Sequence, residues 1–191
     1  MNAKKLSFLL LILVAVACTN RSTSSEQDEM RHWNNVLQQI NALLLENKAR
    51  QTLDLAKQTL PEILESAEKN GTTDTLIYYA RKIFNACGNN YINTKQYKDG
   101  IDYMDSIGNH PLIREHCPHE LLSFKAGLNQ LYGNNPEAVR LAEDYLQLPV
   151  CTSANDFIRQ AEIISGVYMY SGNNLPKAIQ ILEKAIDVSR K

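Results

Sequence analysis

The sequence predicts an all-α fold in which about four helix pairs stack into a solenoid. Apolar residues recur three and four positions apart through most of residues 30–191, which is the period of an amphipathic helix. No run of alternating β-branched residues, as expected for a half-buried strand, is present. Short turn sequences recur at an interval of about 39 residues, which indicates one helix pair per repeat.

Eight apolar stripes define the predicted helices. They lie within residues 30–44, 53–67, 76–91, 97–107, 121–131, 139–146, 161–168 and 178–186. Pro61 interrupts the second stripe, which predicts either a kinked helix or a helix that restarts there. The other prolines fall between stripes. Gly71, Gly108, Gly133 and Gly172 lie at stripe ends, where we expect left-handed C-caps.

The core of such a stack needs small residues opposite large ones. Five alanines are expected to let neighbouring helices approach closely, namely Ala138, Ala142, Ala161, Ala178 and Ala185. Phe84, Tyr91 and Tyr168 are expected to fill the space opposite them.

Composition limits the partners of the chain. Its 191 residues contain 20 Lys and Arg against 21 Asp and Glu, and 44% are hydrophobic. This length allows one core or a short solenoid, but not two large domains. A near-zero net charge offers no basic surplus to neutralise a phosphate backbone, so we expect no nucleic-acid partner.

Residues 1–17 are typical of a secretion signal. Two lysines precede an apolar stretch over residues 6–17, which is shorter than the ~20 residues needed to span a bilayer. The sequence Ala15-Val16-Ala17-Cys18 resembles the lipobox of bacterial lipoproteins. This resemblance implies cleavage before Cys18 and diacylation of its thiol; the alternative is an uncleaved signal anchor.

The segment after Cys18 bears on where the protein resides. Thr19 stands where the inner-membrane retention signal of lipoproteins is an aspartate, so the resemblance implies an outer-membrane lipoprotein that faces the periplasm or the exterior. Residues 18–29 are polar and rich in Ser and Thr, which predicts a flexible tether. The helical domain is then expected over residues 30–191.

The repeats resemble the tetratricopeptide repeat (TPR) family. Cys87-Gly88-Asn89-Asn90-Tyr91 is similar to the Leu-Gly-x-x-Tyr of the family's first helix, and Phe84 stands at its preceding aromatic position. The last pair matches at Ala161, Ile164, Tyr168, Gly172, Ala178, Leu182 and Ala185. The resemblance implies a right-handed α-α superhelix that binds a protein or peptide on a concave face formed by the first helices. It specifies packing and leaves the ligand open.

Seven polar residues are candidates for that face by resemblance: Lys82, Asn85, Asn89, Glu120, Ser123, Arg159 and Glu162. Lysine and asparagine side chains can bind a peptide backbone or carboxylate. The alternative is a polar face that contacts only solvent.

We expect neither a metal site nor an enzyme. His110, His116, Cys117 and His119 form the densest cluster of possible ligands, but their spacing matches no paired Cys/His frame. Pro111 and Pro118 lie within this segment, which favours a solvated connector between repeats. No glycine-rich phosphate loop, nucleophile elbow or Ser/His/Asp arrangement is visible, so we expect no cofactor.

Three cysteines remain if Cys18 is lipidated, and an odd number leaves at least one thiol free. Cys117 and Cys151 are the obvious disulfide pair. They precede successive first helices, however, so their separation is expected near the helix spacing of ~8–10 Å, beyond the ~7 Å reach of a disulfide. Cys87 lies on a core stripe and is expected to be a buried apolar residue.

The sequence therefore predicts a lipid-anchored scaffold for protein–protein interaction in the bacterial cell envelope. Two alternatives remain open. The chain ends after an amphipathic helix without a polar capping helix, which favours either self-association through that helix or the sensory input region of a longer signalling protein. Nine tyrosines leave room for a glycan-binding lipoprotein.

Overall fold

A computed structural model describes residues 27–149 and 154–190, and every regular element in these ranges is a helix. The all-α prediction is confirmed for them. The helices are residues 27–45, α2 (Ala49–Asn70), α3 (Asp74–Asn93), α4 (Tyr97–Ile107), α5 (Pro111–His116), α6 (Pro118–Tyr132), α7 (Asn135–Gln147), α8 (Ala154–Tyr170) and α9 (Leu175–Ser189). Eight of them match the eight predicted stripes, and α5 is additional.

The chain divides into two compact units, Met1–Gln39 and Ile40–Lys191. In the first unit the described residues, 27–39, are helical, and Trp33 and Val36 are buried. Helix therefore already includes 27–29, which the sequence placed in the tether. The predicted signal segment, Cys18 and the rest of the tether lie outside the described residues. Among the helices described, none combines the length and apolar character needed to span a bilayer.

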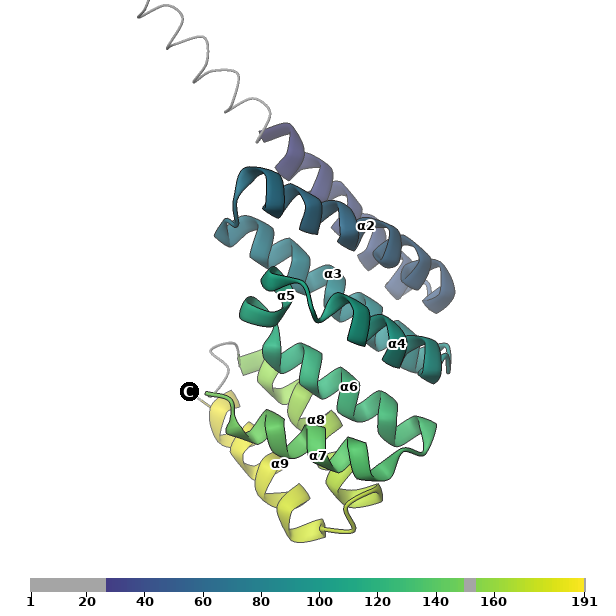
Figure 1. Ribbon diagram of the computed structural model, residues 1–191, viewed down its shortest axis with the longest axis vertical. Coiled ribbons are helices and arrows are strands. Elements are labelled where there is room, and N and C mark those ends of the chain that lie inside the picture. Colours follow the sequence, from purple (N-terminus) through teal and green to yellow (C-terminus); the bar gives the residue numbers. More distant parts are fainter. Residues whose placement is uncertain (1–26, 150–153, 191) are drawn as a thin grey trace, which may run out of the picture. The chain divides into compact units, whose positions relative to one another are not determined.

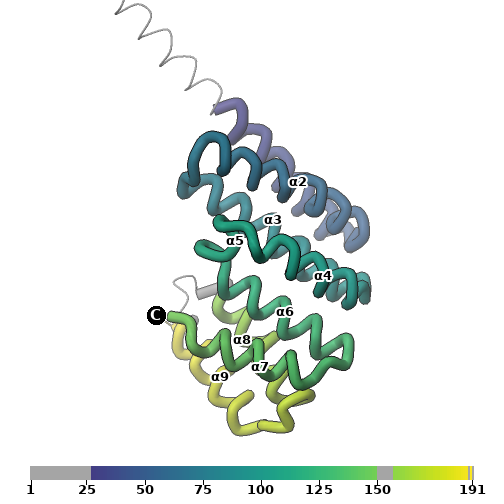
Figure 2. Tube along the Cα trace, in the orientation of Figure 1, coloured from purple at the N-terminus to yellow at the C-terminus, as the bar shows by residue number. Residues whose placement is uncertain are grey.

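The second unit is built from helix hairpins that pack on one another in chain order (Figures 1 and 2). α2 packs on α3, α6 on α7, and α8 on α9, while α6 also contacts α3, α4 and α8. We call α3, α6 and α8 first helices, and α4, α7 and α9 second helices, of their pairs. One continuous core of buried residues runs through α6, α7, α8 and α9.

The predicted division into small and large core residues is confirmed. All five alanines are buried, and four of them are completely inaccessible. Phe84, Tyr91 and Tyr168 are at most 1% exposed. Small side chains, four on second helices and one on α8, thus leave room for the bulky residues of the first helices in the interior.

Pro61 lies inside one continuous helix, α2, so the predicted restart does not occur. Proline removes one backbone hydrogen bond from a helix interior. The neighbouring residues Leu60, Ile63 and Leu64 are buried, and their packing offsets this loss.

Of the four predicted left-handed C-caps, the one at Gly133 occurs, where α6 ends with φ 96° and ψ 5°. Gly71 follows α2 with φ 85° but with ψ 158°, which is not the left-handed helical conformation. Gly108 and Gly172 have no positive φ, and in the last turn it is Asn173 that adopts φ 45°. Gly108 is needed for space instead, because a Cβ there would lie 2.7 Å from the Met104 carbonyl oxygen.

Candidate interaction surface

Close packing between α3 and α6 depends on Gly88. A Cβ at Gly88 would lie 2.4 Å from the ring of Phe124 on α6. The Phe124 ring also meets Phe84 edge-to-face, with centroids 6.1 Å apart. All three residues are buried, so the aromatic ring of one first helix covers the glycine of the preceding one.

The same contact recurs one repeat later. Gly127 on α6 is buried, and a Cβ there would lie 2.8 Å from Ile163 on α8. Gly127 follows Gly88 by 39 residues, and Ile163 follows Phe124 by 39 residues. We call each such pairing of a first-helix glycine with a bulky residue of the next first helix a glycine joint.

A third glycine stands in the same register. Gly166 on α8 follows Gly127 by another 39 residues. It is only partly buried, and a Cβ there would meet just the Gln130 side chain, at 3.8 Å. None of these three glycines has a positive φ, so close approach is what requires glycine at Gly88 and Gly127.

The three predicted residues of α3 lie together on one partly exposed face. Lys82 places its ammonium 5.7 Å from the centre of the Tyr78 ring, and Tyr78 is half exposed. The Asn89 side chain donates to the Asn85 carbonyl at 2.7 Å, within its own helix. Lys82, Asn85 and Tyr78 therefore present a cation, an amide and an aromatic ring to solvent.

Glu120 and Ser123 do not join that face, because both are buried at the start of α6. Arg81 of α3 places its Nε 3.2 Å from the Glu120 carboxylate and donates from its other guanidinium nitrogen to the His116 carbonyl at 2.5 Å. The Ser123 hydroxyl donates to the Glu120 carbonyl. Arg81 thus joins α3 to α5 and α6, and the Glu120 and Ser123 side chains make contacts inside the protein.

The glycine register explains this placement. Thirty-nine residues separate Arg81 from Glu120, and the same interval separates Glu120 from Arg159. The three predicted residues of α3 are thus one position out of phase with the predicted residues of α6 and α8. A shift of one residue turns a helical side chain by about 100°, from the solvent face into the joint.

Arg159 and Glu162 are exposed on α8. Glu162 borders an open groove of about 280 Å³ with Ile158 of α8 and Leu182 and Ile186 of α9. The position equivalent to Glu162 in α6 is Ser123, which is buried. Glu162 therefore belongs to the face that a following first helix would cover.

The segment from His110 to His119 is structured, so the prediction of a solvated connector was wrong. His110 caps α5 by accepting a hydrogen bond at Nδ1 from the Leu112 amide, and its Nε2 lies 3.1 Å from Glu68. Cys117 is buried. His119 Nε2 lies 2.6 Å from the Pro149 carbonyl oxygen. In the described part of the chain, no three His, Cys, Asp or Glu residues are grouped as metal ligands.

Cys87 and Cys117 are buried, and neither takes part in a disulfide within the described residues, whereas Cys151 lies outside them. Burial raises the pKa of the Cys87 thiol to about 12. Its Sγ lies 3.8 Å from the Tyr103 hydroxyl, whose own pKa is raised by burial. The Lys57 ammonium lies 5.5 Å from the centre of the Tyr91 ring and 5.8 Å from that of Tyr103. These contacts join α2, α3 and α4. Burial keeps the thiol protonated, although the Tyr103 hydrogen bond and the Lys57 charge both lower its pKa.

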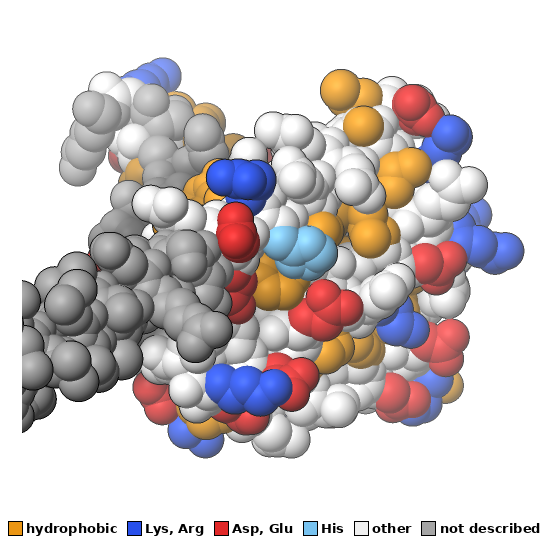
Figure 3. All heavy atoms as spheres, turned by 90° about the horizontal axis from the view of Figure 1, so that it is seen from above, with side chains coloured by type: hydrophobic (Ala, Val, Ile, Leu, Met, Phe, Trp, Pro, Cys, Tyr) orange, Lys and Arg blue, Asp and Glu red, His pale blue; other side chains and the backbone are white. Residues whose placement is uncertain are grey.

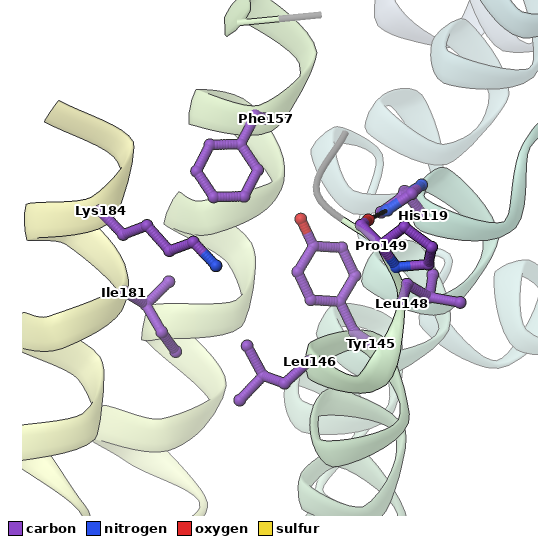
Figure 4. Close-up of a pocket in the computed structure, with 8 residues that line it drawn as sticks. All are labelled: His119, Tyr145, Leu146, Leu148, Pro149, Phe157, Ile181 and Lys184. Carbon is purple, nitrogen blue, oxygen red and sulfur yellow. Dashed lines mark hydrogen bonds between the residues drawn. The ribbon is translucent and has the colours of Figure 1, made fainter. Parts of the chain in front are cut away.

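A small cavity lies among α6, α7, α8 and α9 (Figure 4). Its volume is about 40 Å³, far below the ~300 Å³ of a typical ligand site. The ring of Tyr145 projects from α7 towards Phe157 of α8, and the Tyr145 hydroxyl donates to Gln160 at 3.1 Å. This cavity is a gap between packed helices and is too small to hold a substrate.

Charges on the face seen in Figure 3 alternate in sign, with acidic and basic side chains interspersed among apolar and neutral ones. Ion pairs of opposite charge also occur within single helices; Arg140, for example, binds both Glu137 and Asp144 within α7. An interspersed surface lacks the single-sign field that attracts polyanions.

Comparisons with protein-family models, with curated proteins and with solved structures found no match to this chain. The TPR resemblance therefore stays a prediction. Sequence reasoning identified Gly88 as part of the TPR-like motif but missed Arg81, Gly127 and Gly166, although the 39-residue interval between the three glycines is visible in the sequence.

Proposed function

We propose that this protein is a lipid-anchored, TPR-like scaffold that binds other proteins in the bacterial cell envelope and performs no covalent chemistry. The observation that carries the proposal is the repeated glycine joint. Two joints with the same residue classes at the same interval support a true structural repeat. Repeats that stack in one direction form an extended surface, the property that helical solenoids use for binding.

The right-handed superhelix belongs to this proposal. Each first helix lies beside the first helices of its neighbours, since α6 packs on both α3 and α8. Each second helix also contacts the first helix that follows, as α4 contacts α6 and α7 contacts α8. These are the contacts expected when helix pairs of an α-solenoid are related by one repeated rotation.

The binding face is the exposed side of α3. Lys82, Asn85 and half-exposed Tyr78 combine a charge, a hydrogen-bonding amide and an aromatic ring within three helical turns. Such a combination is typical of protein-binding surfaces, where aromatic residues provide contact area and polar groups fix orientation. A peptide with a carboxylate near an apolar side chain would match it.

The lipid anchor rests on the lipobox-like sequence that ends at Cys18. Each acyl methylene in the bilayer contributes ~0.8 kcal/mol, and two chains give stable attachment. The anchor would hold the repeats at the membrane surface, where a weak partner interaction gains from the high local concentration.

In-cell crosslinking followed by pull-down of the full chain tests this proposal. We expect Cys18→Ala to move the protein out of the membrane fraction. We expect Lys82→Glu combined with Asn85→Ala to abolish a specific crosslinked partner, and the matched variant Lys95→Glu, also at an exposed lysine, to retain it. An unacylated wild-type chain, or the same crosslinks in all variants, would refute the proposal.

Glycan binding is the second candidate, and one observation favours it. Tyr132 and Tyr170 end successive first helices and are 54% and 73% exposed. Exposed tyrosine rings can stack on sugars. Calorimetric titration with cell-wall oligosaccharides should show heat that is lost in Tyr132→Ala/Tyr170→Ala; no heat with wild type would exclude this candidate.

A further inference from the structure

Asn70-Gly71 is the only asparagine–glycine pair in the sequence, and it lies at the turn between α2 and α3. In such a pair the backbone nitrogen of glycine can attack the side-chain amide carbon of asparagine, because glycine has no Cβ to obstruct the approach. The new N–C bond replaces the bond to the side-chain nitrogen, which leaves with the proton of the glycine amide as ammonia. Water then opens the resulting five-membered succinimide at either carbonyl, which leaves aspartate or isoaspartate.

The attacking nitrogen is accessible in the fold. The amides that follow α3, α4 and α6, at Thr94, Gly108 and Gly133, donate hydrogen bonds to the preceding helical turn. Within the described residues the Gly71 amide makes no such bond. Gly71 is exposed, and a Cβ there would have no atom within 4 Å. Neither a hydrogen bond nor a neighbouring side chain of the described residues therefore blocks this nitrogen.

The Asn70 side chain and backbone are weakly held. The side chain is exposed, and its Nδ2 donates to the Ser66 hydroxyl oxygen at 3.3 Å, which is long for a hydrogen bond. Asn70 is the last residue of α2, and the next capping contact is at Thr73, whose hydroxyl accepts from the Leu76 amide. Ring closure requires the Asn70 backbone to leave the helical conformation, and here this disturbs a helix end rather than a helix interior.

A second pair with related chemistry is protected by the fold. Aspartate also forms a succinimide with a following glycine, with loss of water, and Asp99-Gly100 is such a pair. It lies inside α4, where the Gly100 amide donates to the Gln96 carbonyl at 2.9 Å. Gly100 is buried, and Leu128 and Tyr91 stand 3.0 Å from the position of a Cβ there. The fold therefore leaves one pair open to reaction and closes the other.

The reaction would change the connection between α2 and α3. The product carries a negative charge at the C-terminal end of α2, where the helix dipole disfavours one. It also has no N–H group to donate to Ser66. Isoaspartate in addition routes the backbone through the former side chain, which adds one methylene to the turn. Each of these changes is expected to weaken the packing of α2 on α3.

We propose that Asn70 is a site of spontaneous modification, at which the folded protein is converted with time into a more acidic form with a weakened α2–α3 hairpin. Water is the only co-reactant that this chemistry needs. The inference therefore depends on neither the anchor nor the partner of the proposed function.

Timed incubation of the full chain in heavy-oxygen water tests the inference. Hydrolysis of the succinimide during incubation adds a heavy oxygen to residue 70, and a later tryptic digest in ordinary water adds none. Trypsin releases residues 70–81 as one peptide, in which Asn70 is the only asparagine. We expect this peptide to gain label in the folded protein at no less than about a tenth of its rate in urea, because the site needs no unfolding.

The Asp99-Gly100 pair, in the tryptic peptide of residues 99–114, is the internal control. Its labelling should be slower in the folded protein than in urea by more than about tenfold, since it requires α4 to open. Asn70→Ser is the matched variant, because serine is short and polar but cannot form the ring, and its peptide should gain no label at residue 70. A folded wild-type chain in which Asn70 is as strongly protected as Asp99 would overturn the inference.

Isoelectric focusing of the incubated protein gives the second readout. A more acidic form should accumulate in the wild type and be reduced in Asn70→Ser. We expect this form, once separated, to have a lower melting temperature by circular dichroism than the unmodified protein. Equal melting temperatures would overturn the weakening of the hairpin, and an acidic form that accumulates equally in Asn70→Ser would overturn the assignment to Asn70.

Discussion

Gly88 and Gly166 occupy the same position in their repeats, but their surroundings are opposite. Gly88 lies under the ring of Phe124 with no room for a single further carbon, whereas a Cβ at Gly166 would find open space. The neighbouring arginines differ in the same way. Arg81 holds a buried carboxylate, and its equivalent Arg159 is exposed. The same sequence pattern thus occurs once with a bulky side chain packed on the glycine and once without one.

The comparison shows that the repeated sequence pattern gives the first helices equivalent surfaces. Whether such a surface is buried depends on the element that packs against it. Ser123 and Glu162 are equivalent residues, yet the first is buried by α8 and the second is exposed. Substitutions at equivalent positions should therefore have different costs, and those differences measure how each joint contributes to stability.

Replacing Gly88 should have the largest effect. In Gly88→Val the new side chain overlaps the Phe124 ring, whose neighbours are also buried, so the helices must separate. We expect a loss of about 3 kcal/mol or more in the free energy of unfolding, measured by urea denaturation followed by circular dichroism. Gly166→Val is the matched control and should stay within about 1 kcal/mol of wild type. Equal losses at both sites would show that the joints do not differ.

Removing Arg81 should have the next largest effect. Arg81→Met leaves the Glu120 carboxylate, which is 3% exposed, without its guanidinium partner. Loss of one partner from a buried ion pair costs about 3–5 kcal/mol, and the partial exposure of Arg81 lowers this to about 2 kcal/mol. Thermal and urea unfolding of Arg81→Met and Arg159→Met would give the comparison. A loss of stability in Arg159→Met, measured in dilute solution, would contradict the exposure of Arg159 in this chain.

Gly166→Ala should stabilise the monomeric chain. Alanine is favoured over glycine in a helix interior by about 1 kcal/mol, and at Gly166 no side chain is close enough to oppose the added methyl group. Unfolding at protein concentrations too low for association should therefore show a gain of up to about 1 kcal/mol. At Gly127 the same substitution should destabilise, because Ile163 stands 2.8 Å from the new Cβ. A loss of stability in Gly166→Ala would instead show that the added methyl group clashes with another residue of this chain.

The smallest effect concerns a polar contact between α7 and α9. The Lys177 ammonium lies 2.6 Å from the Glu143 carboxylate, and this hydrogen bond lowers the pKa of Glu143 and raises that of Lys177. The contribution of Glu143 is present above its ordinary pKa of 4.5 and is lost as pH falls through its lowered pKa. That of Lys177 is present below its ordinary pKa of 10.5 and is lost as pH rises through its raised pKa.

Lys177→Met should therefore cost less than about 1 kcal/mol at neutral pH, since both groups are partly exposed to solvent. Stability measured from pH 3 to 11 should show the difference from wild type shrinking at both ends. A difference that stays constant through the acid range would assign the effect to packing of the lysine stem on Tyr168.

The helices were predictable from the sequence because nearly all are amphipathic and most are followed within a few residues by a proline, glycine or asparagine. The burial of Cys87 followed from the same stripe. The candidate face was harder: Lys82 and Arg81 are adjacent, and only tertiary contact shows which of them reaches Glu120. α5 was missed although Pro111 follows a capping residue, His110, because six residues show too little periodicity to predict a helix.

Cys87 has a practical consequence. A thiol with a pKa near 12 is almost entirely protonated at neutral pH, so neither an oxidant nor an alkylating reagent can attack it while α3 and α4 stay closed around it. Its rate of alkylation in the folded protein therefore measures how often this part of the stack opens. Mass spectrometry can follow this alkylation without any introduced label, so Cys87 is a natural probe of local opening.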